Sequence, residues 1–230
     1  MFIIEGNIGA GKSSLLKVIK ERLPHLEVVF EPVNQWHSGK NGQSLLTDFY
    51  ENPERWAYTL ETFAMVCRVK EYIKESSEEK ITKIMERSIF SGHYCFAKND
   101  YINGFMNDIE WETYQAWFSF LTSNKVRIPD GFIYLQVDPK IALERIQHRN
   151  RPGENNISLK YLEDIEKRHN EFLIEKSGLI KQIEDVPVLA LDCNYDFEKD
   201  KQYLEKIIYE ISEFTGTSKK LPQKEKPKWH

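Results

Sequence analysis

The sequence is poor in the features that mark secreted and membrane proteins. Its 230 residues include only three cysteines, Cys67, Cys95 and Cys193, without a C-x-x-C pair. This pattern indicates neither a disulfide framework nor a zinc site, and it favours a reducing compartment. No apolar run approaches the ~18–20 residues that cross a bilayer. We therefore expect a cytoplasmic protein without a membrane segment, and the glycine loop that begins at Gly6 leaves no room for a leader peptide.

A strong excess of one charge is missing as well. Lysine and arginine number 32 against 36 aspartates and glutamates, so the net charge is -4. Such a chain has no general attraction for nucleic acid or anionic lipid. The exception is the Lys/Pro-rich end, since residues 215–230 hold five lysines and one glutamate. We expect one folded domain over residues 1–214, followed by a basic, disordered tail over residues 215–230.

Short apolar runs alternate with helical patterns along the chain. The runs have the length of strands and lie at residues 2–5, 26–30, 81–85, 132–137 and 186–191. Between them, apolar residues recur every three or four positions, as at Leu60, Phe63 and Cys67. This alternation predicts an α/β fold in which helices cover both faces of a parallel sheet. Ligands of such sheets bind beyond the carboxyl ends of the strands.

A phosphate-binding loop follows the first apolar run. Residues 6–13, Gly-Asn-Ile-Gly-Ala-Gly-Lys-Ser, match G-x-x-x-x-G-K-[ST] between a predicted strand and a predicted helix. The glycines let backbone N–H groups surround phosphate oxygens, and the helix adds the positive end of its dipole. We expect Lys12 to reach the β- and γ-phosphates of a nucleoside triphosphate, and the Ser13 hydroxyl to ligate Mg²⁺. A glycine turn that matches by chance is the alternative.

Carboxylates follow the second and third predicted strands. Glu31 comes directly after residues 26–30, and Glu86 stands before Arg87 at the end of the third run. Phosphoryl transfer to an alcohol needs a base for the hydroxyl proton, a metal that bridges phosphates, and cations for the moving charge. Glu31 suits the first role and Glu86 the second. In the structural alternative, Glu31 caps a strand and Glu86 forms a solvated ion pair with Arg87.

An arginine-rich segment has the pattern of a lid. Arg145 and Arg149 are four residues apart on one face of a predicted helix, and Arg151 follows in a Pro/Gly loop. Several guanidinium groups in such a segment could close on phosphate oxygens together. The alternative is an ordinary basic helix end, which the helix dipole favours in any case.

Taken together, these motifs resemble the deoxynucleoside kinases of the deoxycytidine, deoxyguanosine and insect multisubstrate type. The resemblance runs from Phe2 to about Phe214. It rests on residues 6–14, Glu31-Pro32-Val33 with Trp36, residues 50–56, Glu86-Arg87-Ser88, the arginine segment with Glu154, residues 159–162 and residues 191–197. It implies a phosphate-loop kinase with a five-stranded parallel sheet flanked by helices, an arginine-rich lid and, usually, a homodimer. The implied reaction moves the γ-phosphate of ATP or another nucleoside triphosphate to the 5′-hydroxyl of a deoxynucleoside.

The resemblance also implies roles for single residues. Glu31 would be the general base and Arg87 its partner on the 5′-oxygen, while Ser13 and Glu86 would hold Mg²⁺. The triphosphate would be bound by Gly6, Asn7, Ile8, Gly9, Ala10, Gly11, Lys12, Ser13 and Ser14, by the lid arginines Arg145, Arg149 and Arg151, and by Asp196 and Phe197. Tyr50 and Glu154 would bind the sugar 3′-hydroxyl. Trp36 and Phe96 would form aromatic walls around the base, with plain core packing as the alternative for both.

One departure from the family has chemical consequences. The family usually has glutamine in its base-reading helix where this chain has Glu61. A glutamine amide both donates and accepts hydrogen bonds, whereas an ionised carboxylate only accepts. Guanine offers two adjacent donors, N1–H and the 2-amino group; cytosine fits only if its N3 or Glu61 carries a proton. Since an acceptor facing an acceptor costs ~1–3 kcal/mol, we predict a shift toward guanine or another base with paired donors.

A second position modifies this prediction. Arg68, on the same helix face as Glu61, matches an arginine that deoxycytidine and deoxyguanosine kinase-like members pair with an aspartate. This chain has Gly92 at the position of that aspartate. Arg68 could instead pair with Glu61 and neutralise it, or form a salt bridge without reading the base.

Two other functions stay open from the sequence. A nucleoside monophosphate kinase of the thymidylate type shares the loop and lid, but its acceptor carries a phosphate that Glu31, Tyr50 and Glu154 would repel more than hold. A nucleotide-binding module without catalysis would hardly need Glu31, Glu86 and three lid arginines around one point. We expect a small-molecule deoxynucleoside as the partner, and neither nucleic acid nor membrane.

Overall fold

One parallel sheet of five strands forms the centre of the computed structural model, which describes residues 1–33, 44–76, 81–151, 153–197 and 199–217. The strands are β1 Phe2–Gly6, β2 Glu27–Val29, β3 Lys83–Glu86, β4 Gly131–Gln136 and β5 Val188–Asp192. They are hydrogen-bonded in the order β2-β3-β1-β4-β5, with every pair parallel. The order reverses at β1, so the loop that follows β1 opens at the switch point of the sheet, where ligands of this fold class bind.

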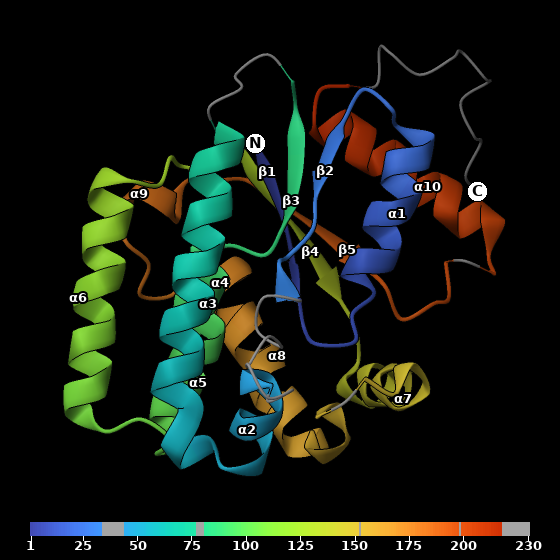
Figure 1. Ribbon diagram of the computed structural model, residues 1–230. Helices are drawn as coiled ribbons and strands as arrows, with labels where there is room; N and C mark the ends of the chain where they lie inside the picture. Colours follow the sequence, from blue (N-terminus) through green and yellow to red (C-terminus); the bar gives the residue numbers. More distant parts are fainter. Residues whose placement is uncertain (34–43, 77–80, 152, 198, 218–230) are drawn as a thin grey trace.

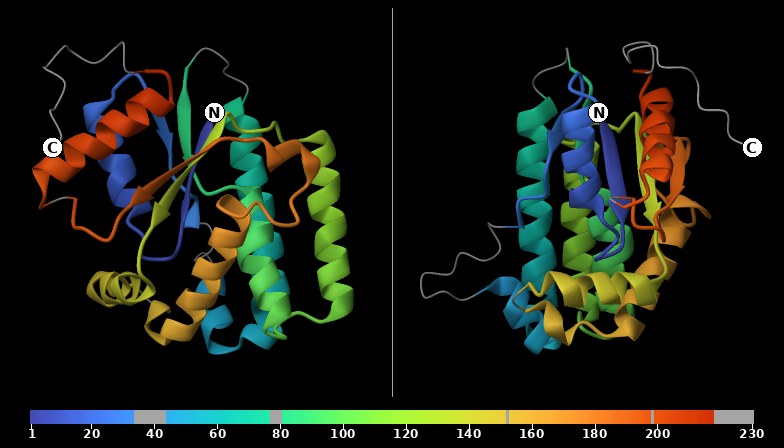
Figure 2. Two further views of the ribbon diagram at one scale, coloured as in Figure 1. Left: turned by 180° about the vertical axis from the view of Figure 1, so that it is seen from behind. Right: turned by 90° about the vertical axis from the view of Figure 1, so that its right-hand side faces the viewer.

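Helices connect the strands and cover both faces of the sheet (Figures 1 and 2). The α-helices are α1 Lys12–Arg22, α2 Leu45–Glu51, α3 Pro53–Ser76, α4 Ile89–Ser91, α5 Lys98–Ile102, α6 Asp108–Asn124, α7 Pro139–Arg149, α8 Leu159–Leu173, α9 Lys181–Glu184 and α10 Lys201–Phe214. A π-helix, η2 Gly92–Ala97, joins α4 to α5, and a 3-10 turn, η3 Glu154–Asn156, precedes α8. None of the described helices is long and apolar enough to cross a membrane.

The strand alternation divides the core into two layers. Ile3 of β1 and Phe132 of β4 belong to the core cluster beneath α3, α6 and α8. Their neighbours Ile4 and Ile133 belong to the cluster beneath α1 and α10. Successive side chains of a strand point to opposite faces, so each buried strand supplies both clusters, and runs of apolar residues without polar alternation result.

The carboxyl ends of the strands meet one group of helices. In Figure 1, α2, α7 and α8 lie beyond these ends, whereas α1 and α10 flank the opposite face from α3 and α6. Side-chain caps fix where several of these helices begin: Ser44 accepts from the backbone N–H of Thr47 at the start of α2, and Ser158 accepts from that of Tyr161 at the start of α8. The caps place Tyr50 and Tyr161 at the edge of the site.

The predicted architecture is confirmed. All five strands lie where the apolar runs predict them, with bounds that differ by at most two residues. The last described helix ends at Phe214. Residues 218–230 of the expected tail lie outside the described residues.

Candidate active site

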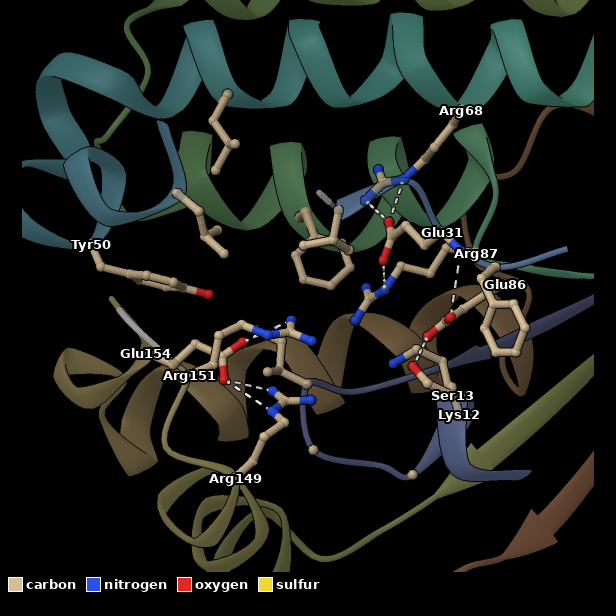
Figure 3. A pocket seen from close by; sticks show the side chains of 18 of the residues that line it. Lys12, Ser13, Glu31, Tyr50, Arg68, Glu86, Arg87, Arg149, Arg151 and Glu154 are labelled. Carbon is tan, nitrogen blue, oxygen red and sulfur yellow. Dashed lines mark hydrogen bonds and ion pairs between the residues drawn. The ribbon is translucent and has the colours of Figure 1, made fainter. Parts of the chain in front are cut away.

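A cavity of about 370 Å³ opens at the carboxyl ends of the strands, within the usual range for small-molecule sites. The phosphate loop, the ends of β2 and β3, helices α2, α3 and α8, η2 and the lid all contribute to its walls (Figure 3). The sequence-predicted residues in its lining are Ile8, Gly9, Gly11, Lys12, Ser13, Ser14, Glu31, Tyr50, Glu61, Arg68, Glu86, Arg87, Phe96, Arg149, Arg151 and Glu154. The fold thus brings together side chains that are scattered over more than 140 positions of the sequence.

The phosphate loop has a backbone that requires glycine. Gly9 has a φ of +79°, and a Cβ there would lie 2.4 Å from the carbonyl oxygen of Ala142 in α7. The loop is braced by its own side chains: Lys12 donates to the carbonyls of Gly6 and Asn7 at 3.0 and 2.8 Å, and Asn7 donates to Leu162 in α8. Burial lowers the pKa of Lys12 to about 7, with Arg87 acting in the same direction. Phosphate oxygens beside this ammonium would restore its charge.

Ser13 and Glu86 form the candidate magnesium site. The Ser13 hydroxyl donates to Glu86 Oε1 at 2.8 Å, and Glu86 Oε2 accepts from the backbone N–H of Glu31 at 3.4 Å. A hydroxyl and a carboxylate at the mouth of a phosphate loop are the hard oxygen ligands that Mg²⁺ takes together with phosphate oxygens and water. The residues therefore fit the ion. Among the described residues no group of three or more His, Cys, Asp or Glu could hold a metal on its own.

Glu31 is held between two arginines, which Figure 3 shows at the centre of the site. Arg68 donates from Nε and Nη2 to Glu31 Oε1 at 2.9 and 2.7 Å, and Arg87 Nε lies 3.2 Å from Glu31 Oε2. Burial alone would raise the pKa of Glu31, but the two guanidinium charges outweigh it and lower the pKa below its ordinary value. Glu31 is therefore a carboxylate across the neutral range. Pairing with Arg87 was expected, whereas the contact with Arg68 was not.

Arg87 occupies a strained position. Its φ is +61°, in the left-handed region that costs a residue with a side chain ~1–3 kcal/mol. Its backbone N–H donates to the Ile4 carbonyl at 3.0 Å, which extends the pairing of β3 with β1 by one residue. The guanidinium lies 4.4 Å from the ring centre of Phe96, a cation–π contact inside the cavity. The turn thereby places Arg87 between the ring of Phe96 and the carboxylate of Glu31.

The lid arginines meet Glu154 rather than each other. Arg149 donates to Glu154 Oε2 at 2.6 and 3.2 Å, and Arg151 donates to Oε1 at 3.2 Å. Glu154 is only 3% exposed. The Tyr50 hydroxyl points into the same space in Figure 3, and burial raises its pKa, with the Glu154 charge adding to that effect. Tyr161, which sequence reasoning did not select, meets Tyr50 edge to face with ring centres 6.5 Å apart.

Six of the predicted residues that the structure describes are not in the cavity wall: Gly6, Asn7 and Ala10 of the phosphate loop, and Arg145, Asp196 and Phe197. Arg145 donates to the carbonyls of Cys193, Asn194 and Tyr195, so it fastens the loop after β5 instead of facing the cavity with Arg149. That loop carries Asp196, which pairs with Lys199, and Phe197, whose ring would contact a Cβ on Gly11 of the phosphate loop. The predicted residue Trp36 lies outside the described residues.

Glu61 and Arg68 form the inner wall of the cavity. Burial raises the pKa of Glu61 to about 7, although Arg68 and Arg87 oppose this shift. Arg68 fills the space that the missing side chain of Gly92 leaves, because a Cβ on Gly92 would lie 2.6 Å from Arg68 Nη1. The lack of a side chain at Gly92 leaves room for the guanidinium that contacts Glu31.

These features define a phosphotransferase of the phosphate-loop class: a nucleotide cradle faces a buried carboxylate, and cations line the space between. The comparisons with known proteins name the family. A family model described as deoxynucleoside kinase matches residues 2–216, and the chain belongs to that family. Its members are phosphotransferases that act on a nucleoside hydroxyl, with a nucleotide as phosphate donor.

Individual relatives agree with this assignment. The chain is 37% identical to deoxycytidine kinase 2 of Gallus gallus, across 92% of this chain and 88% of that protein. It is 36% identical to deoxycytidine kinase of Homo sapiens, across 93% of this chain and 90% of that protein. It is 33% identical to the mitochondrial deoxyguanosine kinase of Xenopus laevis, across 86% of this chain and 82% of that protein. Both base preferences thus occur among relatives at similar distance.

Proposed function

We propose that the protein transfers the γ-phosphate of ATP, or of another nucleoside triphosphate, to the 5′-hydroxyl of a deoxynucleoside, with guanine as the favoured base. The observation that carries the proposal is the position of Glu31: a buried, ionised carboxylate that two arginines hold in the same cavity as Lys12 and Ser13. The experiment that tests it is the acceptor panel described below.

Each of these cavity residues has its own role in the reaction. The Glu31 carboxylate takes the proton of the 5′-hydroxyl while the 5′-oxygen bonds to the γ-phosphorus. The bond from that phosphorus to the β,γ-bridging oxygen breaks. Arg87 holds the attacking oxygen beside Glu31. The nucleoside diphosphate leaves with the bonding electrons, while Lys12 and the lid arginines Arg149 and Arg151 stabilise the charge on the transferred group. The Glu31 proton passes to solvent on product release.

Ser13 and Glu86 would hold Mg²⁺ in this scheme. The ion supplies positive charge against the β- and γ-phosphates of the donor. Glu86 also accepts from the backbone N–H of Glu31, so the metal site and the base are fixed to each other. The loop with Asp196 and Phe197 packs against Gly11, and we assign it to the base of the phosphate donor.

The sugar and the base of the acceptor would contact the remaining walls of the cavity. We assign Tyr50 and Glu154 to the 3′-hydroxyl and Phe96, together with Trp36, to the faces of the base. Offset stacking on such rings is worth ~0.5–1.5 kcal/mol beyond area burial. Glu61 faces the edge of the base, where two acceptor oxygens match the N1–H and 2-amino donors of guanine.

The base preference is tested with deoxyguanosine, deoxyadenosine, deoxycytidine and thymidine as acceptors. We expect deoxyguanosine to have the highest kcat/KM at pH 8, where Glu61 is ionised, and Glu61→Gln to lower the ratio of deoxyguanosine to deoxycytidine about tenfold or more. ADP release and labelled product are both measured. A substitution that leaves the order of the four acceptors unchanged contradicts the assignment of Glu61, and a rate without any acceptor dependence contradicts the kinase assignment itself.

Glu154→Gln tests the link between lid and sugar. The amide keeps the shape of the side chain but loses the charge that holds Arg149 and Arg151 at 2.6–3.2 Å. We expect the KM for the deoxynucleoside to rise about tenfold, since a hydrogen bond to a charged group contributes ~1.5–3 kcal/mol. The wild type should discriminate against 2′,3′-dideoxynucleosides and the variant should lose most of that discrimination. Glu163→Gln, exposed on α8, is the control, and equal discrimination in both variants refutes the assignment.

The remaining properties are proposals of the same kind. We propose one kinase domain over residues 1–214 with a basic tail, in the cytoplasm, where the three buried cysteines stay reduced. We also propose a homodimer. Exposed apolar side chains on the neighbouring helices α3 and α6 support it: Phe63, Val66, Ile73, Ile109, Trp117 and Phe120. Sedimentation equilibrium should give twice the chain mass, and Val66→Asp should shift it toward the monomer.

A further inference from the structure

Two buried carboxyl groups, those of Glu61 and Asp100, have oxygens without a hydrogen-bond partner among the residues that the structure describes. Glu61, on α3, is 5% exposed and lines the cavity, and its Oε2 has no hydrogen-bond partner. Asp100, on α5, is fully buried, and neither of its carboxyl oxygens has one. Buried polar groups are nearly always hydrogen-bonded. Two orphaned carboxyl groups in one region therefore indicate a partner that both can share, and a proton between two carboxyl groups is such a partner.

The surroundings decide which group keeps the proton. Arg68 and Arg87 lower the pKa of Glu61 against its burial. Burial raises the pKa of Asp100 well above its ordinary value, the charge of Glu61 adds to this effect, and no cation of the described residues opposes it. The other ionisable groups that face the pair are Glu31 after β2, Tyr50 on α2, Tyr114 on α6 and Tyr161 on α8. Two like charges in such a site cannot both form, so Asp100 is the protonated member.

We propose that Asp100 is a positioning residue for base recognition: it keeps the one proton of the pair and donates its O–H toward Glu61, which is thereby held as a carboxylate against the edge of the base. The inference rests on the proposed role of Glu61 and adds the residue that sets its charge. The hydrogen bond runs directly or through one ordered water. It provides a partner for Glu61 Oε2 and for one oxygen of Asp100 at once, in the manner of carboxyl pairs that share a proton at catalytic sites.

This arrangement makes base selection depend on pH. Above the point at which Glu61 loses its proton, the carboxylate accepts from the two donors of guanine. Below it, protonated Glu61 both donates and accepts as a glutamine does, and so matches cytosine or adenine. A hydrogen bond donated to a carboxylate favours its charged form. The Asp100 O–H therefore keeps Glu61 ionised at a lower pH than burial alone would allow.

The experiment measures the ratio of kcat/KM for deoxyguanosine to that for deoxycytidine between pH 5.5 and 9. The wild-type ratio should rise at least fivefold across a midpoint near neutral pH. Asp100→Ala should move the midpoint upward by about one pH unit, because the donor is lost. Asp100→Asn keeps a donor at this position and should restore the wild-type midpoint. In Glu61→Gln the ratio should not vary with pH, and adding Asp100→Ala should change nothing. Asp108→Ala, at the exposed start of α6, is the control.

Each other outcome overturns the inference. A midpoint that moves downward in Asp100→Ala means that Asp100 was ionised beside Glu61. If the midpoint does not move and kcat/KM falls equally for both acceptors, Asp100 only supports the fold. Should Asp100→Ala fail to fold, infrared difference spectra of wild type and Asp100→Asn at pH 8 decide: the band of a protonated carboxylic acid must be present in the former and lost in the latter. A protein without any deoxynucleoside-dependent turnover contradicts the proposed function instead, and leaves the infrared result to judge the pair.

Discussion

Glu31→Gln should lower kcat for deoxynucleoside phosphorylation by ~10²–10⁴-fold, the usual contribution of a positioned general base. The amide has the size of the carboxylate but cannot accept a proton. It also weakens the contacts with Arg68 and Arg87, at 2.7–3.2 Å, that fix this side chain in the cavity. The KM for ATP should change little, because Glu31 lies on the acceptor side of the phosphate loop. Steady-state rates with both substrates varied give the two constants.

A matched control separates catalysis from folding. Glu27→Gln removes a carboxylate at the start of the same strand, where it faces Lys83 at 3.4 Å instead of the cavity, and should keep kcat near the wild-type value. The pH dependence gives a second check. Because the two arginines lower the pKa of Glu31, its protonation should reduce kcat only at a lower pH than an isolated glutamate would require. A Glu31→Gln enzyme within threefold of the wild type contradicts the assignment of the base.

Lys12→Met should reduce kcat/KM for ATP by ~10²–10³-fold, the loss found when one preorganised donor to a developing charge is removed. Met keeps the length of the apolar stem but supplies no charge to the β- and γ-phosphates. The side chain also braces the loop through the carbonyls of Gly6 and Asn7. We therefore expect weaker ATP binding together with slower transfer, measured by calorimetry and by single-turnover kinetics.

Lys20→Met is the control for Lys12→Met. Lys20 lies on the same helix α1, is exposed, and is not part of the cavity wall. Its substitution should leave both ATP affinity and turnover within about twofold, as surface substitutions generally do. Equal behaviour of the two variants would mean that the loop does not hold the donor.

Most of the fold could be predicted from local sequence patterns. The phosphate loop depends on a short run of glycines between a strand and a helix, so its position follows from neighbours in the sequence. The five strands were found for the same reason, since each lies in or beside a short apolar run of the sequence; β1, β3 and β4 are the buried ones, and β2 and β5 form the edges of the sheet. Glu31 and Glu86 could be selected because parallel strands end at one edge of the sheet.

Contacts between distant segments were not predictable in this way. The pairing of Arg68 with Glu31 joins residues 37 positions apart and depends on the space above Gly92, which no periodicity reveals. Arg145 shares a helix with Arg149, yet it turns to the loop after β5 because the carbonyls of that loop need donors. Asp100 follows Lys98 and Asn99 in a short helix, a polar sequence that is typical of a surface, yet the fold buries it completely.

The proposed reaction is defined by its acceptor atom, the 5′-oxygen of the deoxynucleoside. The most direct measurement mixes the wild-type enzyme with ATP labelled at the γ-phosphate and, in separate reactions, deoxyguanosine, 2′,5′-dideoxyguanosine and deoxyguanosine 5′-monophosphate. We predict label in the 5′-monophosphate from the first reaction and none above background in the other two. Label transferred to the compound without a 5′-hydroxyl, or faster transfer to the monophosphate, would contradict the account.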